Sequence, residues 1–410
     1  MRETNTITAT EFDIVVVGGG IYGMITALEA SLMGVRVLLV EREELGCGTT
    51  KSWLRILHGG LRYLQFLDIK RFFESVAERR WFLQHFSEFC VPLQCLMPLY
   101  QGRGPSRLLM APGLFVNDVL SLGRNAGMPN SVHINQSRVV SKHDVLDLAP
   151  FVNSEGLLGG ASWYDGHVLH PDRLIDAIKH WSTALGALVL TGYEATGLLT
   201  SNGRVTGCSV TDAKTGRTTD VTARIVVNAT GHQVPQLAKS WGDALGDVPK
   251  LSWAWNVLFD IDYPYSSAVA VSAPADGSQT LFVLPWKGKT LVGTGNQCIP
   301  DSANPANLPD EALNRFVLQA QLAAPGLGLN TSRIEEVMLG WMPVVCCDPI
   351  EYPKRPLLKE HSASGLQGLY SIWGIKYTTA RREARRVLKM AFPNEFAKGV
   401  HYDRRFPVRQ

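Results

Sequence analysis

The sequence lacks the features that mark membrane-spanning, secreted and metal-cluster proteins. No run of about 18 apolar residues occurs, so we expect no transmembrane helix. The first residues, MRETNTITATEFD, are polar, so we expect a frayed tail and no secretory signal. The seven cysteines include no C-x-x-C pair, which argues against a disulfide framework or a zinc site. These absences predict a cytoplasmic protein without a bound metal.

Charge of one sign is also scarce. The net charge is +3 over 410 residues, which is too small to indicate nucleic-acid binding. Hydrophobic residues make up 45% of the chain and charged residues 19%, as in globular proteins with large cores. The length fits two or three domains, or one large α/β unit with an inserted lobe.

What is present begins with the segment FDIVVVGGGIYGMITALEASLMGVRVLLVERE. An apolar, β-branched run over 14–17 predicts a buried strand, and 35–40 predict a second strand after a helical pattern. Between strand and helix, Gly18, Gly20 and Gly23 have the G-x-G-x-x-G spacing. In that pattern the first glycine makes a tight turn, the second admits a pyrophosphate and the third lets the helix pack closely. The segment therefore predicts a dinucleotide site, with an empty β-α-β unit as the alternative.

Glu41 ends the second predicted strand, where it can accept a hydrogen bond from a ribose hydroxyl. The helix start offers N–H groups and a positive dipole end to phosphates. A carboxylate at this position would repel a 2′-phosphate, which disfavours NADP. FAD and NAD both remain open on these residues alone.

Two later segments have the same strand-turn-helix order. TARIVVNATGHQVPQLAKS predicts a strand over 224–227 that breaks at NATG. GLYSIWGIKYTTARREARRVLKM predicts a strand over 369–372, a turn at Gly374 and a helix capped by Thr378 or Thr379. The start of that helix can face negative charge developing on a reduced flavin. The alternative is a plain C-terminal helix with a solvated basic face.

Together these segments resemble the FAD-dependent glycerol-3-phosphate dehydrogenases, within the D-amino-acid-oxidase-like superfamily. The resembling stretches run along nearly the whole chain: VVGGGIYG, GCGTT…HGGLRYL, APGLFVNDVLSLG, VNATG, FVLPWKGKTLVGTG and SIWGIKYTT. HGGLRYL is uncommon and specific. The resemblance implies FAD as the cofactor. Bacterial members usually carry a further helical C-terminal domain, which we expect this chain to lack.

The resemblance also implies an α/β fold with an α+β substrate lobe. A Rossmann-like FAD-binding domain would be assembled from residues 1–66, 140–248 and 337–410. Residues 67–139 and 249–336 would form a substrate-binding domain with an antiparallel sheet. We expect strands of that sheet at 251–260, 279–284 and 289–293.

The cofactor contacts implied by the resemblance come from all three segments. In GCGTTKSWLRILHGG the glycines would let backbone N–H groups point at phosphate and at the flavin edge. The expected cofactor residues are Gly18, Gly20, Ile21, Tyr22, Gly23, Glu41, Arg42, Thr49, Ser52, Ile56, His58, Gly59, Ala195, Ala229, Thr230, Gly231, Gly374, Lys376, Tyr377 and Thr378.

Five residues carry the expected catalysis: His58, Arg62, Tyr63, Lys359 and Lys376. Arg62 and Tyr63 match substrate-pocket residues of the family, and an arginine can hold a phosphate or carboxylate bidentately. Lys376 matches the lysine of the family's GGKLTT motif. His58 is the candidate base, and Lys359 falls near a substrate-binding arginine of the family. A structural role for His58 and an exposed surface position for Lys359 are the alternatives.

Three departures from the family concern the substrate pocket. Met342 stands where the family has an arginine for the substrate phosphate. Trp253 and Trp255 lie where a histidine is expected, and Asn296 and Gln297 replace an acid. Loss of a charge-assisted contact costs about 1.5–3 kcal/mol. We therefore expect an alcohol larger or less charged than free glycerol 3-phosphate, stacked on a wall of tryptophans.

The predicted reaction is oxidation of a polyol-like, sugar-like or phosphorylated secondary alcohol by hydride transfer to flavin N5. The alternatives are an amine or amino-acid oxidase and a non-catalytic FAD-binding subunit. We expect a small-molecule substrate and a quinone, oxygen or an electron-transfer protein as electron acceptor. The segment 95–120, with Arg103 and Arg107, favours a helix packed on the substrate-lobe sheet. Peripheral contact with the cytoplasmic membrane face is the alternative.

Overall fold

The computed structural model describes residues 11–102, 107–243, 249–274 and 278–399. The expected frayed tail and Arg103 lie outside these ranges. The chain forms two compact units, each built around its own sheet. We call them unit 1 (Met1–Lys51, Asp172–Leu251 and Met342–Gln410) and unit 2 (Ser52–Pro171 and Ser252–Trp341).

Unit 1 contains an eight-stranded sheet in the order β18-β19-β10-β1-β2-β7, with β9 and β8 added beside β10. Strands from β19 to β7 are parallel, and the edge strand β18 is antiparallel to β19. Near-continuous apolar runs such as FDIVVV form its centre, as expected for a sheet covered on both faces. The strands are β1 (Phe12–Val17), β2 (Val37–Glu41), β7 (Leu188–Thr191), β8 (Tyr193–Ser201), β9 (Arg204–Asp212), β10 (Thr218–Asn228), β18 (Leu357–Glu360) and β19 (Leu369–Trp373), with a small separate pair β16 (Cys346–Cys347) and β17 (Ile350–Glu351).

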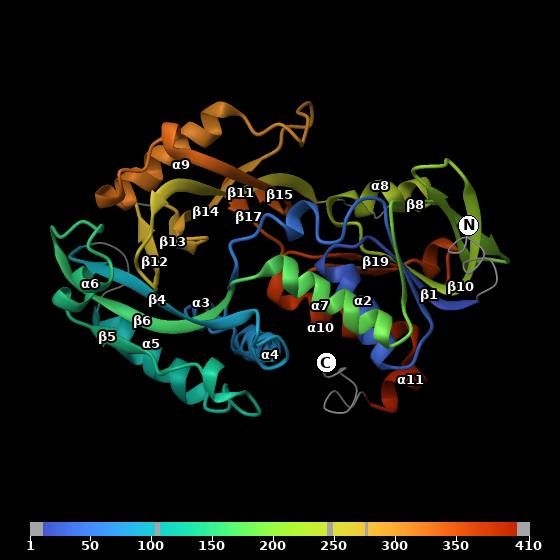
Figure 1. Cartoon of the computed structure of the whole chain (residues 1–410), viewed down its shortest axis with the longest axis horizontal. Helices are drawn as coiled ribbons and strands as arrows, with labels where there is room; N and C mark the ends of the chain where they lie inside the picture. Colours follow the sequence, from blue (N-terminus) through green and yellow to red (C-terminus); the bar gives the residue numbers. More distant parts are fainter. Residues whose placement is uncertain (1–10, 103–106, 244–248, 275–277, 400–410) are drawn as a thin grey trace. The chain divides into compact units, whose positions relative to one another are not determined.

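The helices of unit 1 include α2 and α10, which lie against each other (Figure 1). Fully buried Glu29 on α2 accepts hydrogen bonds from Arg381 and Arg385 of α10, and Glu383 binds the two other arginines of that helix. The basic face of α10 is therefore not simply solvated. The helices are α2 (Ile21–Leu32), α7 (Pro171–Ala184), α8 (Val234–Ser240), α10 (Ala380–Ala391) and α11 (Pro393–Ala397), with 3₁₀ turns at Gly48–Thr50, Gly231–Gln233, Ser362–Ser364 and Tyr377–Thr379.

Unit 2 contains a nine-stranded sheet in the order β15-β11-β14-β13-β12-β4-β6-β3, with β5 beside β6. The three strands expected from sequence are present as β11, β13 and β14, and they pair antiparallel. Only β12 and β4 are recorded as a parallel pair among the described residues of this sheet. The strands are β3 (Ile56–Leu57), β4 (Cys90–Tyr100), β5 (Arg138–Val140), β6 (Leu157–Val168), β11 (Lys250–Asp262), β12 (Ala268–Ser272), β13 (Thr280–Trp286), β14 (Lys289–Cys298) and β15 (Ile334–Val344).

The helices of unit 2 pack on this sheet. The segment expected to be one helix is divided: residues 95–100 belong to β4, and α5 follows and packs against β5 and β6. Met110 and Leu114 of α5 are buried, whereas Phe115 is 70% exposed. The helices are α3 (Leu61–Leu64), α4 (Ile69–His85), α5 (Arg107–Leu120), α6 (Lys142–Leu148) and α9 (Asp310–Ala323), with 3₁₀ turns at Asn130–Val132, Pro325–Leu327 and Thr331–Arg333.

The compact units depart from the expected domain boundaries in two long stretches and, by a few residues, at 249–251 and 337–341. Residues 52–66 and 140–171 pack in unit 2, because β3 and β6 pair with each other in its sheet, with Ile56 opposite His167. Each of these stretches therefore belongs to the unit whose sheet it joins, although residues 52–66 lie closer in sequence to the glycine motif of unit 1. Which ligand each unit binds stays a prediction at this point.

Two further expectations concern the chain as a whole. Among the described residues, no helix combines the length and apolar character needed to cross a membrane. Five cysteines are free thiols, and Cys298 and Cys347 are disulfide-bonded, a bond that the sequence did not predict.

Candidate functional site

The glycine turn of unit 1 is shaped by two close backbone approaches. Gly18 has φ +105°, and a Cβ there would lie 2.7 Å from the carbonyl oxygen of Ala229. A Cβ on Gly23 would lie 1.8 Å from the carbonyl oxygen of Gly18. Both positions therefore exclude a side chain. The same approaches bring the NATG turn, with Ala229 and Thr230, directly against the turn after β1.

The start of α2 leaves backbone donors unused. Gly20 occupies the N-cap position and has no side chain that could accept a hydrogen bond from these donors. The Ile21 N–H donates to Thr50 Oγ1 at 3.0 Å, whereas those of Gly20, Tyr22 and Gly23 donate to no described residue. Unused N–H groups at a helix start, with its positive dipole end, fit a pyrophosphate. The second threonine of GTT is the one that reaches this helix, and the expectation named only Thr49.

Glu41 supports the glycine turn from the end of β2. Its buried carboxylate accepts hydrogen bonds from the Gly19 N–H at 2.5 Å and from the Glu43 N–H at 2.8 Å. A carboxylate has about four lone-pair positions, so a ribose hydroxyl can still donate to it. The neighbouring Arg42 lies 3.5 Å from the Glu43 carboxylate.

The NATG turn is closed by its asparagine. Asn228 Oδ1 accepts from the backbone and hydroxyl of Thr230, and Asn228 Nδ2 donates to the Val234 carbonyl. Gly231 follows with φ +63°. Ala195 does not join these residues, because its side chain lies in the apolar core of unit 1.

Tyr22 connects the glycine motif to the C-terminal segment. Its hydroxyl donates to the Lys376 carbonyl at 2.7 Å and shares a hydrogen bond of 2.9 Å with Thr379 Oγ1. A Cβ on Gly374 would lie 1.9 Å from the Tyr22 ring, so this turn also requires glycine. Burial raises the pKa of Tyr22, which keeps the phenol protonated as a donor.

Thr379 is the N-cap residue of α10, but it makes no capping bond there. Its hydroxyl donates to the Lys376 carbonyl instead. The expected N-cap position of Thr379 is confirmed, but its hydroxyl serves the link to Tyr22 and does not cap the helix. Tyr377 and Thr378 are buried in this segment and Lys376 is exposed.

Lys359 is held within unit 1. Its Nζ lies 2.8 Å from Asp243 Oδ2, and the same oxygen pairs with Nδ1 of fully buried His361. The other ring nitrogen of His361 lies 2.9 Å from Ser371 Oγ on β19. Burial would raise the pKa of Asp243, but hydrogen bonds from Lys359 and His361 lower it. The Lys359 ammonium thus neutralises a carboxylate.

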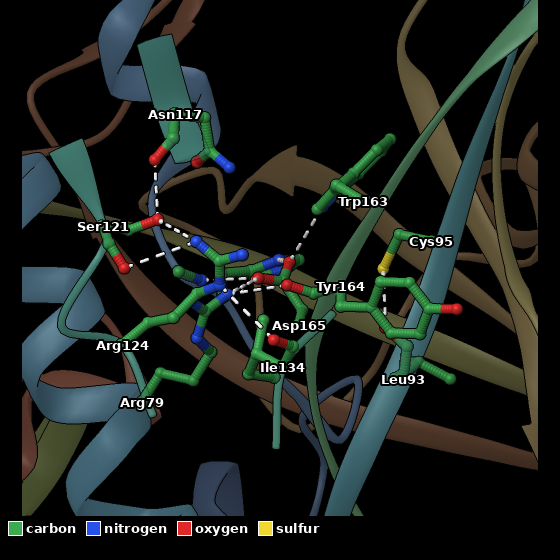
Figure 2. Close-up of polar contacts among 12 residues, drawn as sticks. Arg79, Leu93, Cys95, Asn117, Ser121, Arg124, Ile134, Trp163, Tyr164 and Asp165 are labelled. Carbon is green, nitrogen blue, oxygen red and sulfur yellow. Dashed lines mark hydrogen bonds and ion pairs between the residues drawn. The ribbon is translucent and has the colours of Figure 1, made fainter. Parts of the chain in front are cut away.

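A buried carboxylate organises the HGGLRYL segment of unit 2. Asp165 Oδ1 accepts from the Gly59 N–H at 2.6 Å and from Arg79 Nη1 at 2.9 Å. Its Oδ2 lies 3.0 Å from His58 Nδ1 and 3.3 Å from Trp163 Nε1. Figure 2 shows Arg79 of α4 and Trp163 of β6 converging on this carboxylate.

The electrostatics of this cluster favour an ionised Asp165. Burial would raise its pKa, but the hydrogen bond from His58, the charges of His58 and Arg79, and the Gly59 N–H lower it to about 2. Burial lowers the pKa of the Arg79 guanidinium, and the Asp165 carboxylate opposes that shift. The pair is a buried ion pair, and the Asp165 carboxylate has four polar contacts in all.

The two glycines of HGG follow from this cluster. A Cβ on Gly59 would lie 2.1 Å from Arg79 Nη1, and Gly60 has φ +89° as α3 begins. The expectation that the Gly59 N–H points at the cofactor is wrong, because Asp165 uses it. The Ile56 side chain lies in the core of unit 2, and the Ser52 carbonyl accepts from Asn256 Nδ2.

The two residues of α3 that the sequence predicts in the substrate pocket, Arg62 and Tyr63, have different surroundings from each other. Arg62 is exposed and forms no hydrogen bond or ion pair with any residue that the structure describes. The Tyr63 ring lies 4.6 Å from the Arg71 guanidinium. Arg62 thus has its full hydrogen-bonding capacity for an anion.

A family model for FAD-dependent oxidoreductases matches residues 13–380. The chain belongs to this family of FAD-dependent oxidoreductases. The oxidoreductase is 28% identical to a glycerol-3-phosphate dehydrogenase of Synechocystis, over 93% of this chain and 70% of the relative. It is 30% identical to a glycerol-3-phosphate dehydrogenase of Mycobacterium leprae, over 90% of this chain and 61% of the relative.

Among solved structures, the glycerol-3-phosphate dehydrogenase of Bacillus halodurans, complexed with FAD, has a similar fold. The TM-score is 0.72 at 21% identity, over 95% of the oxidoreductase and 66% of that chain. The unused N–H groups of α2 and the close approach at Gly18 fit the pyrophosphate of FAD. The helix start at Gly20 would hold the pyrophosphate, and the Glu41 carboxylate would accept from a ribose hydroxyl.

The expected stacking wall of the oxidoreductase is wrong. Trp253 and Trp255 are 1% and 2% exposed. Residues at i and i+2 of a strand share a face, and the Trp255 ring packs against Phe316 of α9 at 5.9 Å. Trp253 Nε1 donates to the Pro305 carbonyl at 2.7 Å. Both indoles are core residues of unit 2.

A second polar cluster of the oxidoreductase was not expected from sequence. Arg55 is buried with φ +68°, and its guanidinium lies 4.9 Å from the centre of the Trp286 ring. His167 faces the same ring at 6.4 Å. Burial, and next the charge of Arg55, lower the pKa of His167 to about 4. His167 is therefore neutral in the folded protein near pH 7.

Proposed function

We propose that the oxidoreductase oxidises a secondary alcohol that is polyol-like, sugar-like or phosphorylated. The relatives named glycerol-3-phosphate dehydrogenase support an alcohol as substrate. Bound FAD supplies a flavin ring whose N5 accepts a hydride. The observation that carries the proposal is the half-exposed His58 ring, whose Nδ1 is anchored by Asp165. Its other nitrogen, Nε2, has no described partner and suits a proton acceptor.

The proposed residue roles follow from exposure and charge. His58 Nε2 takes the proton of the substrate hydroxyl. Arg62, exposed and cationic, binds a phosphate or hydroxyl group of the substrate, and Tyr63 lines the same segment. Lys376 orients the substrate hydroxyl. Lys359 is left out, because its ammonium already neutralises Asp243.

One residue, Met342, bears on which class of alcohol is the substrate. Met342 replaces an arginine of the family, which favours a less charged alcohol than free glycerol 3-phosphate. The tryptophan argument for a ring-shaped substrate no longer holds, because both indoles are buried. Glycerol 3-phosphate therefore belongs in the first panel of substrates.

The test is anaerobic bleaching of the oxidised-flavin absorption band. The panel contains glycerol 3-phosphate, sugar phosphates, free polyols, 2-hydroxy acids and secondary amines. Reduction by an alcohol supports the proposal, and reduction only by amines identifies an amine oxidase. Bound flavin that no compound reduces would identify a non-catalytic subunit.

His58→Gln is the variant that tests the proton acceptor. Its reduction rate is expected to fall about 10²–10⁴-fold, because general-base catalysis contributes that much. The flavin content should stay unchanged, since the α2 donors lie in unit 1. A rate within about threefold of wild type would assign the base elsewhere.

We further propose a quinone, oxygen or an electron-transfer protein as electron acceptor and a peripheral membrane contact. The α3–α4 corner exposes Phe66 and Leu67 beside the cations Arg62 and Lys70. Apolar side chains rimmed by cations suit an anionic bilayer surface. Cosedimentation with vesicles of phosphatidylserine and phosphatidylcholine tests this. Binding that persists in Leu67→Ser with Phe66→Ser would count against this surface.

A further inference from the structure

The direction of the hydrogen bond between His58 and Asp165 is fixed by charge. Three groups that can only donate, the Gly59 N–H, Arg79 Nη1 and Trp163 Nε1, reach the Asp165 carboxylate, and the buried Arg79 cation keeps it ionised, so it can only accept. His58 Nδ1 must therefore carry the proton of their 3.0 Å hydrogen bond. In the neutral ring the other nitrogen, Nε2, then has a free lone pair. A carboxylate on one imidazole nitrogen thus defines the tautomer of the whole ring.

We infer that Asp165 is a positioning residue that holds His58 in the Nδ1–H tautomer and so makes Nε2 the proton acceptor. This inference rests on the proposed function for its consequence in catalysis. Arg79 has the supporting role of keeping the buried carboxylate ionised. None of these roles is evident from the HGGLRYL segment itself, because Asp165 lies 107 positions after His58.

The carboxylate fixes His58 at two points. Oδ2 binds the ring, and Oδ1 binds the backbone N–H of the next residue, Gly59. Side chain and main chain are thereby fixed by a single group, which is itself held by Arg79 and Trp163. The Phe282 ring of β13 lies 5.5 Å from the imidazole and limits its rotation. Such double support is what keeps a catalytic side chain in one geometry.

The proposed step balances with FAD as the oxidant. The substrate hydroxyl bond to hydrogen breaks, and its proton goes to Nε2 to give an imidazolium. The hydrogen on the carbinol carbon leaves with its electron pair, which FAD would accept as hydride when bound, and a carbonyl forms. The Nδ1 proton stays on the ring. Asp165 remains ionised and stabilises the new positive charge across the hydrogen bond.

The charged groups facing His58 come from two elements. Asp165 is on β6, and Arg79, 2.9 Å from the carboxylate, is on α4. Arg124 adds positive charge near Arg79, and its own guanidinium lies 3.6 Å from Asp118. The carboxylate is thus the anion that directly contacts the imidazole among the described residues.

The variant Asp165→Asn separates charge from shape. An asparagine can accept from Gly59 and Arg79 with its oxygen while its NH₂ group donates to Nδ1. The ring proton then moves to Nε2, and the acceptor is lost. We expect flavin reduction by the alcohol to slow about 10²–10⁴-fold, with substrate Kd within about threefold, as an equivalent change does in a serine protease triad.

Trp163→Phe is the matched control. It also removes one hydrogen bond from Asp165, the 3.3 Å contact of Nε1, but it leaves the carboxylate charge and the tautomer. We expect its reduction rate to stay within about threefold of wild type. A merely structural role for the cluster would slow both variants alike, and that result would overturn the inference.

A ¹⁵N spectrum of histidine-labelled protein at alkaline pH reads the tautomer without any assay of activity. The His58 signals are identified by their loss in His58→Gln. The wild type should show a protonated Nδ1, and Asp165→Asn should show a protonated Nε2. A neutral wild-type ring protonated on Nε2 would overturn the inference even if Asp165→Asn fails to fold.

Failure of the proposed function and failure of the positioning role of Asp165 give different results. If no alcohol reduces the flavin, the proposed function fails while the spectrum still decides the role of Asp165. If an alcohol reduces wild type and Asp165→Asn at the same rate, the positioning role fails and the proposed function stands.

Discussion

The helix start at Gly20 and the ring of His58 both leave a polar group unused, but they do so by different means. In unit 1 the unused groups are the backbone N–H donors of Gly20, Tyr22 and Gly23, beside the Ile21 N–H that the Thr50 hydroxyl accepts. In unit 2 the unused group is a side-chain acceptor, created by a buried carboxylate. Backbone donors do not titrate, whereas an imidazole and a carboxylate do. The comparison predicts that the effects of substitutions around the titratable groups of unit 2 depend on pH, whereas the effects of substitutions in the glycine turn of unit 1 do not.

The largest effect is expected for Arg79→Met. It leaves the buried Asp165 carboxylate without its cation, which costs about 3–5 kcal/mol in the free energy of unfolding. Urea unfolding measures it. Arg80→Met is the matched control, because among the described residues the neighbouring Arg80 donates only to the Gly123 carbonyl and should matter by about 1 kcal/mol or less. Equal destabilisation by the two variants would remove the special role of the cluster.

The second-largest effect is the pH dependence of the free energy of unfolding that His167 causes. Its pKa falls from 6.5 to about 4 on folding, through burial and then Arg55. The unfolded chain binds this proton below pH 6.5, so the stabilising contribution is full above that pH and is lost as pH falls to about 4. The loss amounts to about 3 kcal/mol. Urea unfolding at several pH values measures this loss. The free energy of unfolding of His167→Gln should not show it, whereas that of His170→Gln, which replaces an exposed histidine, should show it in full.

Gly23→Ala tests the backbone side of the comparison. The new Cβ would lie 1.8 Å from the Gly18 carbonyl oxygen, and such overpacking costs about 1–3 kcal/mol. We expect FAD to bind about 10–100-fold more weakly, at all pH values alike. Flavin content after purification and titration with FAD measure it. Gly113→Ala, with open space around it, is the control, and a pH-dependent loss in Gly23→Ala would contradict the comparison.

The smallest effect is expected for Tyr22→Phe. It removes the hydroxyl contacts to the Lys376 carbonyl and to Thr379, worth about 1 kcal/mol. FAD affinity should fall by about 3–10-fold, because the glycine motif and the C-terminal segment are then less well joined. Tyr193→Phe on β8 is the control for loss of a phenol elsewhere in unit 1. An unchanged FAD affinity would mean that the two segments are held by packing alone.

Local patterns predicted the parts of the fold that depend on neighbouring residues. β1, β2 and the turn at Gly18 follow from an apolar run and glycine spacing, and both are readable within a few positions. β1, β2 and this turn are specified by short-range chemistry, so a sequence alone suffices for them. β11, β13 and β14 were expected from the family resemblance and are present.

The residues that sequence reasoning missed depend on partners far along the chain. Asp165 sits in WYDGHV, where nothing distinguishes a buried carboxylate from an exposed one, and its partner Arg79 is 86 positions away. Lys359 was misjudged for the same reason, since Asp243 reaches it only in the folded unit. The tryptophans were misjudged because the strand pattern did not tell which face α9 covers.

The hydroxyl of Tyr22 has a consequence for the order of protein synthesis. It binds the Lys376 carbonyl, 354 positions later, so the glycine turn is completed only after the segment that contains Lys376 has left the ribosome. Unit 2 ends at Trp341 and can fold before that moment, whereas the first strand of unit 1 must wait for β19 and α10. β1 and the glycine turn are thus exposed to chaperones and proteases until β19 and α10 are synthesised.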